Sequence, residues 1–237
     1  MERLITILPS GRRESRDFGW LQTSWLLSFD DYYDPDNIEF GVLRVFNDDT
    51  IAPRRGFPAH RHSEMEIVTV LLAGRLNHRD SAGNEGFLKE GDVQRMSAGT
   101  GVVHSEMNNG KEPLHMLQLW FLPDRGRLRP SYEQGSYPRE EWRDRLLPLV
   151  SGMDKEGAIS MSSPATLYGS ALSGQRQIVM SGGKRRVLVY LLHGDLAVEG
   201  RSLEVNGQVR CEIDGNLRFN SGEGALFVAV EMPEGDK

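Results

Sequence analysis

Short apolar runs separated by turn residues are the feature of this 237-residue chain that most restricts its fold. The runs recur along the whole sequence, at Phe40 to Phe46, Ile67 to Leu72, Met116 to Leu122, Val187 to Leu192 and Ala225 to Val230. Each run is short for a helix but long enough for a buried strand, and glycine, asparagine, aspartate or proline lies between the runs. Strands with this spacing predict an all-β protein, either a sandwich or a barrel.

Turn residues support the same interpretation and indicate two domains. Asp80 to Gly86 places aspartate, asparagine and two glycines between two candidate strands, as a hairpin connection requires. By contrast, Pro138 to Leu149 has apolar residues at helical spacing around Trp142 and predicts a short helix. A chain of this length can form two cores of about 100 residues each, so we expect one unit at 1–135 and a second at 136–237.

The two halves share a weak internal repeat. In the first half, Val68 to Gly74 is followed later by Glu90 to Met96; in the second, Val187 to Gly194 is followed later by Ser221 to Phe227. Each half therefore has an apolar strand, a glycine turn and a later strand that begins after a glycine. A duplicated barrel is the simplest explanation of this pattern.

Composition argues against several classes of protein. The chain is 38% hydrophobic and 26% charged, as an ordinary water-soluble protein is. No apolar stretch approaches the roughly 18 to 20 residues of a membrane-spanning helix, and Leu4 to Leu8 is too short for a signal peptide. The single cysteine, Cys211, agrees with a reducing compartment, so we expect a cytoplasmic location. A net charge of −6, with basic residues only in short clusters, disfavours nucleic-acid binding.

Two pairs of residues could bind a metal ion. His60 and His62 form one pair, and His104 and Glu106 form the other. On an extended strand, residues i and i+2 point to the same face, so each pair would present two ligands together. On neighbouring strands the pairs would offer three nitrogens and one oxygen at about 2.0 to 2.2 Å from a divalent ion. The alternative, a hydrogen-bonded polar cluster in a surface groove, stays open on these residues alone.

The sequence around both pairs resembles the pirin family. The resemblance rests on Gly56 to Val70, His78 to Ser81 and Gly91 to Glu106, and it weakens in the second half of the chain. It implies two barrels of the cupin type, each a double-stranded β-helix or jelly roll. It also implies one divalent metal ion in the first barrel, held by His60, His62, His104 and Glu106. The founding member usually binds iron, which we therefore expect first, while zinc, manganese, nickel, cobalt and copper remain open.

Several pirins resemble quercetin 2,3-dioxygenases, which open a flavonol ring with O2 and release carbon monoxide. The resemblance therefore implies a metal-dependent dioxygenase that acts on a small, flavonol-like aromatic. We expect Glu106 to take a proton from this substrate, provided that one of its oxygens stays off the metal. Two other functions remain open: a metal- or redox-sensing regulator that binds a protein partner, and a non-oxidative isomerase.

Further polar residues receive weaker predictions. His78 and His115 either orient a metal ligand or make ordinary structural hydrogen bonds. Glu64 and Glu66 lie close to the first histidine pair, but the pirin pattern takes its carboxylate from Glu106, so we expect them outside the ligand set. The role of Asn108 stays open. The second barrel is expected to be metal-free, because the strand after Gly224 contains no histidine.

Overall fold

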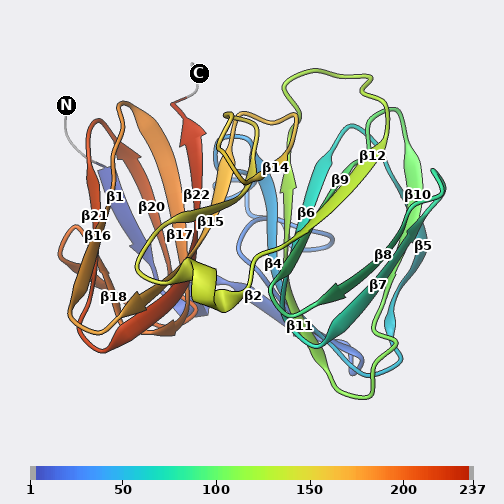
Figure 1. Cartoon of the computed structure of the whole chain (residues 1–237), viewed down its shortest axis with the longest axis horizontal. Coiled ribbons are helices and arrows are strands. Elements are labelled where there is room, and N and C mark those ends of the chain that lie inside the picture. Colours follow the sequence, from blue (N-terminus) through green and yellow to red (C-terminus); the bar gives the residue numbers. More distant parts are fainter. Residues whose placement is uncertain (1–3, 235–237) are drawn as a thin grey trace. The chain divides into compact units, whose positions relative to one another are not determined.

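The computed structural model describes residues 4–234, and nearly all of its regular structure is β-strand (Figure 1). Its two helical segments are single 3-10 turns, η1 (Ser10–Arg12) and η2 (Arg139–Trp142). The chain divides into two compact units. The unit that we call the first barrel consists of Arg13–Pro138 and Ile159–Ser163. The second barrel consists of the chain up to Arg12, Arg139–Ala158 and the chain from Pro164 onward. The predicted all-β class is confirmed.

Two antiparallel sheets form the first barrel. The larger sheet has the strand order β12-β9-β6-β11-β4-β3-β2. Its strands are β2 (Glu14–Asp17), β3 (Leu21–Trp25), β4 (Leu43–Ile51), β6 (Glu66–Ala73), β9 (Asp92–Ser97), β11 (Leu114–Phe121) and β12 (Ser131–Ser136). The smaller sheet has the order β5-β10-β7-β8, with β5 (Gly56–His62), β7 (Arg75–Asp80), β8 (Glu85–Lys89) and β10 (Val102–Met107). The returning segment carries the short strand β14 (Ile159–Ser160).

The second barrel repeats this arrangement. Its larger sheet contains the order β1-β20-β17-β22-β15-β13. These strands are β1 (Leu4–Leu8), β13 (Leu147–Ser151), β15 (Thr166–Ser173), β17 (Arg185–Gly194), β20 (Gln208–Ile213) and β22 (Gly224–Pro233). Its smaller sheet has the order β16-β21-β18-β19, with β16 (Arg176–Met180), β18 (Leu196–Val198), β19 (Arg201–Leu203) and β21 (Leu217–Ser221).

The shared strand order supports duplication but corrects one part of the predicted repeat. β6 and β17 occupy the same place in their sheets; Gly74 follows β6 and Gly194 ends β17, and both glycines have a positive φ. β9 lies next to β6 at the place that β20 occupies next to β17. The sequence pattern matches β9 to β22 instead, because a glycine lies at the start of each strand: Gly91 precedes β9, and Gly224 begins β22.

The division of the chain differs from the predicted boundary at 135 and 136 in two places. β1 pairs antiparallel with β20, so the first strand of the chain completes the second barrel. The chain also returns to the first barrel at Ile159–Ser163. Both differences depend on partners that are distant in sequence, which a local pattern does not identify.

The helix expected over Pro138 to Leu149 is wrong beyond its first turn. Only Arg139–Trp142 is helical, and Leu147–Ser151 forms strand β13 against β15. Trp142 is fully buried, and its ring fills the space directly above Gly169 of β15. Burial of this large ring and pairing with β15 outweigh the helical spacing, which is a weak preference over so short a segment.

Apolar side chains fill both ends of the space between the sheets of the first barrel, and a polar layer separates them. Along β6, the positions that face the smaller sheet are Ile67, Thr69 and Leu71. Gln118 on β11 and Gln94 on β9 lie directly beside Thr69 in the sheet register. All three polar side chains are buried. Polar groups persist in such a core only where they are hydrogen-bonded, so this layer indicates a functional site inside the barrel.

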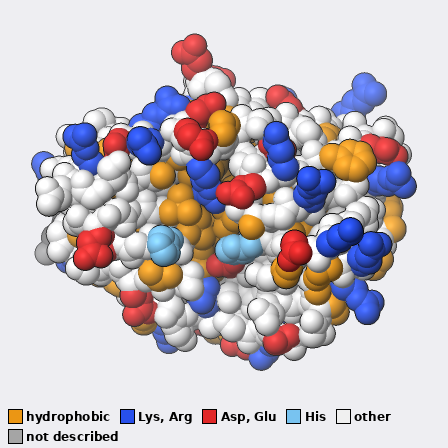
Figure 2. All heavy atoms as spheres, turned by 60° about the horizontal axis from the view of Figure 1, so that its bottom comes forward, with side chains coloured by type: hydrophobic (Ala, Val, Ile, Leu, Met, Phe, Trp, Pro, Cys, Tyr) orange, Lys and Arg blue, Asp and Glu red, His pale blue; other side chains and the backbone are white. Residues whose placement is uncertain are grey.

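On the face that Figure 2 shows, basic and acidic side chains are interspersed, with hydrophobic and histidine side chains exposed among them. Within residues 4–234, no helix has the length and apolar character needed to cross a bilayer.

Candidate metal centre

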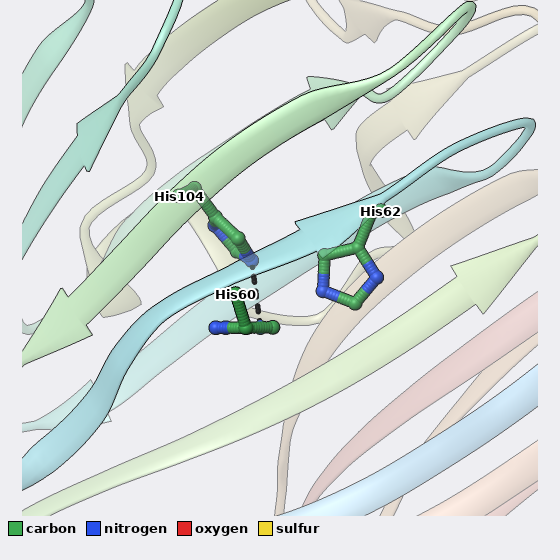
Figure 3. A group of neighbouring side chains, drawn as sticks. All are labelled: His60, His62 and His104. Atoms are coloured by element: carbon green, nitrogen blue, oxygen red, sulfur yellow. Dashed lines mark hydrogen bonds between the residues drawn. The ribbon is translucent and has the colours of Figure 1, made fainter.

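Two neighbouring strands of the smaller sheet bring the predicted metal-binding pairs together. β5 carries His60 and His62, and β10 pairs with it antiparallel so that His104 lies opposite His60. Figure 3 shows the three imidazoles converging from these two strands. The ring centroids are 4.7 Å apart for His60 and His62, 4.5 Å for His60 and His104, and 4.9 Å for His62 and His104.

An irregularity in the pairing sets the position of Glu106. His104 pairs with His60, but Glu106 pairs with Phe57, so β5 has one extra residue between these two points. Pro58 lies within this bulge and has no N–H to donate to the ladder, which makes it a suitable residue there. The carbonyl of Pro58 instead accepts a hydrogen bond from Nδ1 of His60 at 2.8 Å. With its proton on Nδ1, His60 presents the lone pair of Nε2 to the cluster.

The three imidazoles fit one metal ion. Their ligand atoms all lie within 4.8 Å of one another. Nε2 of His60 and Nε2 of His104 are 3.1 Å apart. Two nitrogens at about 2.1 Å from one ion would be separated by about 3.0 Å at a right angle and about 3.4 Å in a tetrahedron. The two nitrogens form a hydrogen bond in this structure, and their separation also lies within the range for two ligands of one ion. Imidazole suits zinc, copper, iron and nickel.

Burial keeps the imidazoles of His62 and His104 neutral, which is the form that binds metal. It lowers the pKa of His62 to about 4, with a further contribution from the positive charges that His104 and His60 would carry. Burial likewise lowers the pKa of His104 to about 3, and His60 and His78 add to the effect. Both rings are therefore neutral at pH 7, and a neutral imidazole has the free lone pair that a metal ligand needs.

The carboxylate of Glu106 projects from β10 into the polar layer of the larger sheet. Thr69 and Gln94 donate hydrogen bonds to its Oε1, at 3.2 and 2.6 Å. Gln118 donates to its Oε2 at 2.6 Å. Tyr132 in turn donates to Oε1 of Gln94 at 3.0 Å, which orients that amide. These contacts fix both carboxylate oxygens of a residue that is 1% exposed.

Glu106 falls in a second group of possible ligands, which overlaps the first at His104. Ligand atoms of His78, His104 and Glu106 lie within 4.8 Å of one another, and all three residues are buried. Nε2 of His78 is 3.4 Å from Asp80 Oδ2, and its ring stacks on Tyr132 with centroids 4.5 Å apart. His78 thus lies beside His104 and Glu106, and its role there stays a prediction.

A cavity of about 460 Å³ opens beside the candidate centre. Aromatic side chains form much of its wall, and three of their contacts are edge-to-face with centroids 5.4 Å apart: Trp20 with Phe57, Trp25 with Phe29, and Phe29 with Trp120. His60, His62 and Glu106 also line it. Such a wall suits a flat aromatic ligand. The sequence analysis missed these aromatic residues, because they come from separate segments and follow no local pattern.

Three buried polar residues of the cavity wall were also missed: Thr23 on β3, and Asn47 and Asp49 on β4. Asp49 lies opposite Thr23 in the sheet, and Asn47 lies opposite Gln118. Burial raises the pKa of Asp49 to about 7, and the negative charges of Asp48 and Glu106 also act in this direction. The interrupted apolar run ending at Phe46 suggested that the strand stops there, whereas β4 continues to Ile51.

The remaining candidates lie outside the two ligand groups. Glu66 accepts a hydrogen bond from Ser97 at 2.5 Å, and Glu64 accepts from the backbone N–H of Arg127. Nε2 of His115 is 2.6 Å from Asp48 Oδ1, which is the structural hydrogen bond given as one of its two possible roles. Asn108 is fully buried, and its amide donates to the carbonyls of Ile51, Ala52 and Glu112, so it holds two loops together.

The second barrel has apolar residues at the places that match the polar layer. Counting from the two equivalent glycines and following the strand pairing, Val189, Val209 and Ala229 correspond to Thr69, Gln94 and Gln118. Phe219, which pairs with Val198, corresponds to Glu106, which pairs with His78. Phe219 stacks on Phe227 with centroids 5.3 Å apart, inside a continuous apolar core.

Comparison with known proteins identifies the family of this chain. The family model for pirin matches residues 10–121. A pirin-like protein of Caulobacter vibrioides is 36% identical over 94% of this chain and 90% of its own length. The chain belongs to the pirin family. The resemblance noted from the sequence is thereby confirmed, and with it the cupin fold.

Two further relatives concern metal and substrate. A pirin of Escherichia coli, YhhW, has a crystal structure in complex with nickel(II). Its sequence is 30% identical to this pirin, and the two structures superpose with a TM-score of 0.91 over 97% of this pirin and 99% of the YhhW chain. The quercetin 2,3-dioxygenase of Escherichia coli K12 is 35% identical over 83% of this pirin and 85% of its own length. The nickel complex and the histidine cluster together support a divalent metal in this family member.

Proposed function

We propose that this pirin is a metal-dependent dioxygenase that cleaves flavonols such as quercetin with O2. The observation that carries the proposal is the convergence of three imidazoles beside an aromatic cavity. The name of the Escherichia coli K12 relative, quercetin 2,3-dioxygenase, suggests the substrate class. The nickel(II) complex of the pirin YhhW supports a divalent ion. Iron stays our first expectation for the metal, and nickel is the alternative that the relative favours.

His60, His62 and His104 would be the nitrogen ligands, and Glu106 the oxygen ligand. When bound, such an ion supplies Lewis acidity toward an ionised hydroxyl of the ligand. Hydrogen bonds from Thr69, Gln94 and Gln118 orient the Glu106 carboxylate. Oε2 accepts one of these hydrogen bonds and therefore keeps a lone pair with which to coordinate.

The aromatic wall would position the substrate. The rings of Phe57 and Trp120 flank the histidines: Phe57 lies 6.3 Å from His60, and Trp120 lies 4.8 Å from His62, between ring centroids. A flavonol packed between such rings loses water from both faces and has little freedom to turn. Positioning of this kind contributes a large part of the rate in reactions between two bound reactants.

Oxygen consumption tests the proposal. The purified protein is loaded with Fe(II) or Ni(II) in separate samples and supplied with quercetin, and O2 uptake is followed with an electrode. We expect uptake by the wild-type protein and loss of it in His60→Ala and Glu106→Ala. His193→Ala is the matched control, because His193 is an exposed residue of the second barrel. Bound metal without O2 uptake on any flavonol would contradict the dioxygenase and favour a sensing role.

A further inference from the structure

Two polar atoms of the cavity wall, Oδ1 of Asn47 and Oδ1 of Asp49, have no hydrogen-bond partner among the residues that the structure describes. Thr23 lies opposite Asp49, and its hydroxyl group interacts with that carboxyl group. The three residues are 2 to 3% exposed, and all line the cavity. An unmet polar atom in a buried site costs about 1 to 3 kcal/mol, so its retention here indicates a partner that the cavity receives.

Asp49 differs from Glu106 in what surrounds its carboxyl group. Three side chains donate to the oxygens of Glu106, so both of these oxygens have hydrogen-bond partners. Asp49 has an oxygen without a partner in the described part of the chain. Asp49 also lies close to Gln118, which donates a hydrogen bond to Glu106. Asn47 is two residues before Asp49 on the same face of β4, and it lies opposite Gln118 on the neighbouring strand β11.

We propose that Asp49 accepts the hydroxyl proton of an aromatic ligand bound in this cavity, and that Asn47 and Thr23 help to place that hydroxyl. The O–H bond of the ligand breaks, its electron pair stays on the ligand oxygen, and the proton forms a new O–H bond with a carboxylate oxygen of Asp49. No oxidant or reductant takes part in this transfer. The inference rests on the proposed function, because it assumes a ligand with an acidic hydroxyl.

The charges around Asp49 suit a group that exchanges a proton near neutral pH. Asp48 on its own strand and Glu106 on β10 disfavour its ionised form, whereas a hydrogen bond from Thr23 on β3 and the charge of His115 on β11 favour it. Asp30, His60 and His62 are the other titratable residues that line the cavity. A proton acceptor is most effective when its pKa lies near the working pH.

Binding of 3-hydroxyflavone without O2 tests the inference, because this flavonol has a single hydroxyl. The absorbance of the bound flavonol reports whether it is ionised, and calorimetry in buffers of different ionisation enthalpy counts the protons released to solvent. At about pH 8 we expect the wild-type protein to bind the ionised flavonol while releasing well under one proton. Asp49 is largely ionised at this pH before binding, and the negative charge of the bound flavonol then raises the affinity of Asp49 for the transferred proton. In Asp49→Asn we expect either about one proton released per ligand or a bound flavonol that stays neutral.

Two controls make the comparison specific. Asp36→Asn carries the same substitution at an exposed residue of the first barrel that does not line the cavity, and should behave as the wild type. Flavone, which lacks the hydroxyl, should bind to Asp49→Asn and to the wild-type protein equally well. If circular dichroism shows that Asp49→Asn is unfolded, Asp49→Ser is used in its place. Release of one full proton by the wild type, or identical behaviour of the Asp49 variant, would overturn this inference and leave the metal centre and O2 uptake untouched. Failure of the wild type to bind any flavonol would overturn the proposed function as well.

Discussion

Replacement of Asp49 by asparagine should change how stability depends on pH. The carboxyl group has a pKa raised by burial from 3.8 to about 7 in the folded chain. The folded state therefore holds a proton that the unfolded chain loses at lower pH. A raised carboxyl pKa makes the native state less stable as the pH rises from the unfolded value to the folded value, and the cost is constant above that.

The size of the effect follows from the shift. A change of about 3 pKa units corresponds to about 4 kcal/mol once both states are ionised, at 1.36 kcal/mol per unit. Part of this cost is already present at pH 5, so between pH 5 and pH 8 we expect it to grow by about 2 to 3 kcal/mol. Asparagine has no such titration. The stability of Asp49→Asn relative to the wild type should therefore rise by this amount over the same interval.

Urea unfolding, followed by tryptophan fluorescence with a chelator present, measures this difference. Three of the four tryptophans, Trp20, Trp25 and Trp120, lie in the first barrel, so the signal reports mainly on the barrel that contains Asp49. The gap between the two midpoints should widen by on the order of 1 M urea from pH 5 to pH 8. A gap that stays constant with pH would refute the argument, because it would mean that Asp49 titrates equally in both states.

Other parts of the structure give further expectations. Gln94→Ala removes the 2.6 Å hydrogen bond to Glu106 and should weaken metal affinity by about 10- to 100-fold in a competition with a chromogenic chelator; unchanged affinity would show that this contact does not orient a ligand. Gly56→Ala would push a methyl group into the carbonyl oxygen of Glu106 and should destabilise the protein by about 1 to 3 kcal/mol in thermal melts, whereas Gly183→Ala, which has open space, should not. Burial raises the pKa of the Cys211 thiol to about 12, so it should react with a thiol reagent at pH 8 only after unfolding, and rapid reaction of the native protein would contradict this.

The strands and the paired ligands were accessible from the sequence because both follow a period of two residues. The alternation that makes a strand also places His60 beside His62 and His104 near Glu106, so local spacing contains the information. Polar residues inside apolar strands were a further signal that could have been used. Thr69 and Gln118 interrupt otherwise apolar runs at inward-facing positions, which is the mark of a buried polar site.

Other features depend on contacts between distant segments. Asn47-Asp48-Asp49 has the composition of a turn, yet pairing with β3 and β11 keeps it extended and turns Asp49 into the cavity. Likewise, β1 joins a partner about 200 residues away, and nothing in Leu4–Leu8 itself identifies β20. The aromatic wall is assembled in the same way from separate strands and loops, so it could be found only once the fold was known.

The central claim is that one metal ion is held by His60, His62, His104 and Glu106. Elemental analysis of the purified protein tests it most directly. We expect close to one equivalent of a divalent transition metal in the wild-type protein and in His193→Ala, and a loss of most of it in His60→Ala and His104→Ala. Wild-type protein without bound metal after incubation with Fe(II) or Ni(II), or full retention in the His60 and His104 variants, would contradict the account.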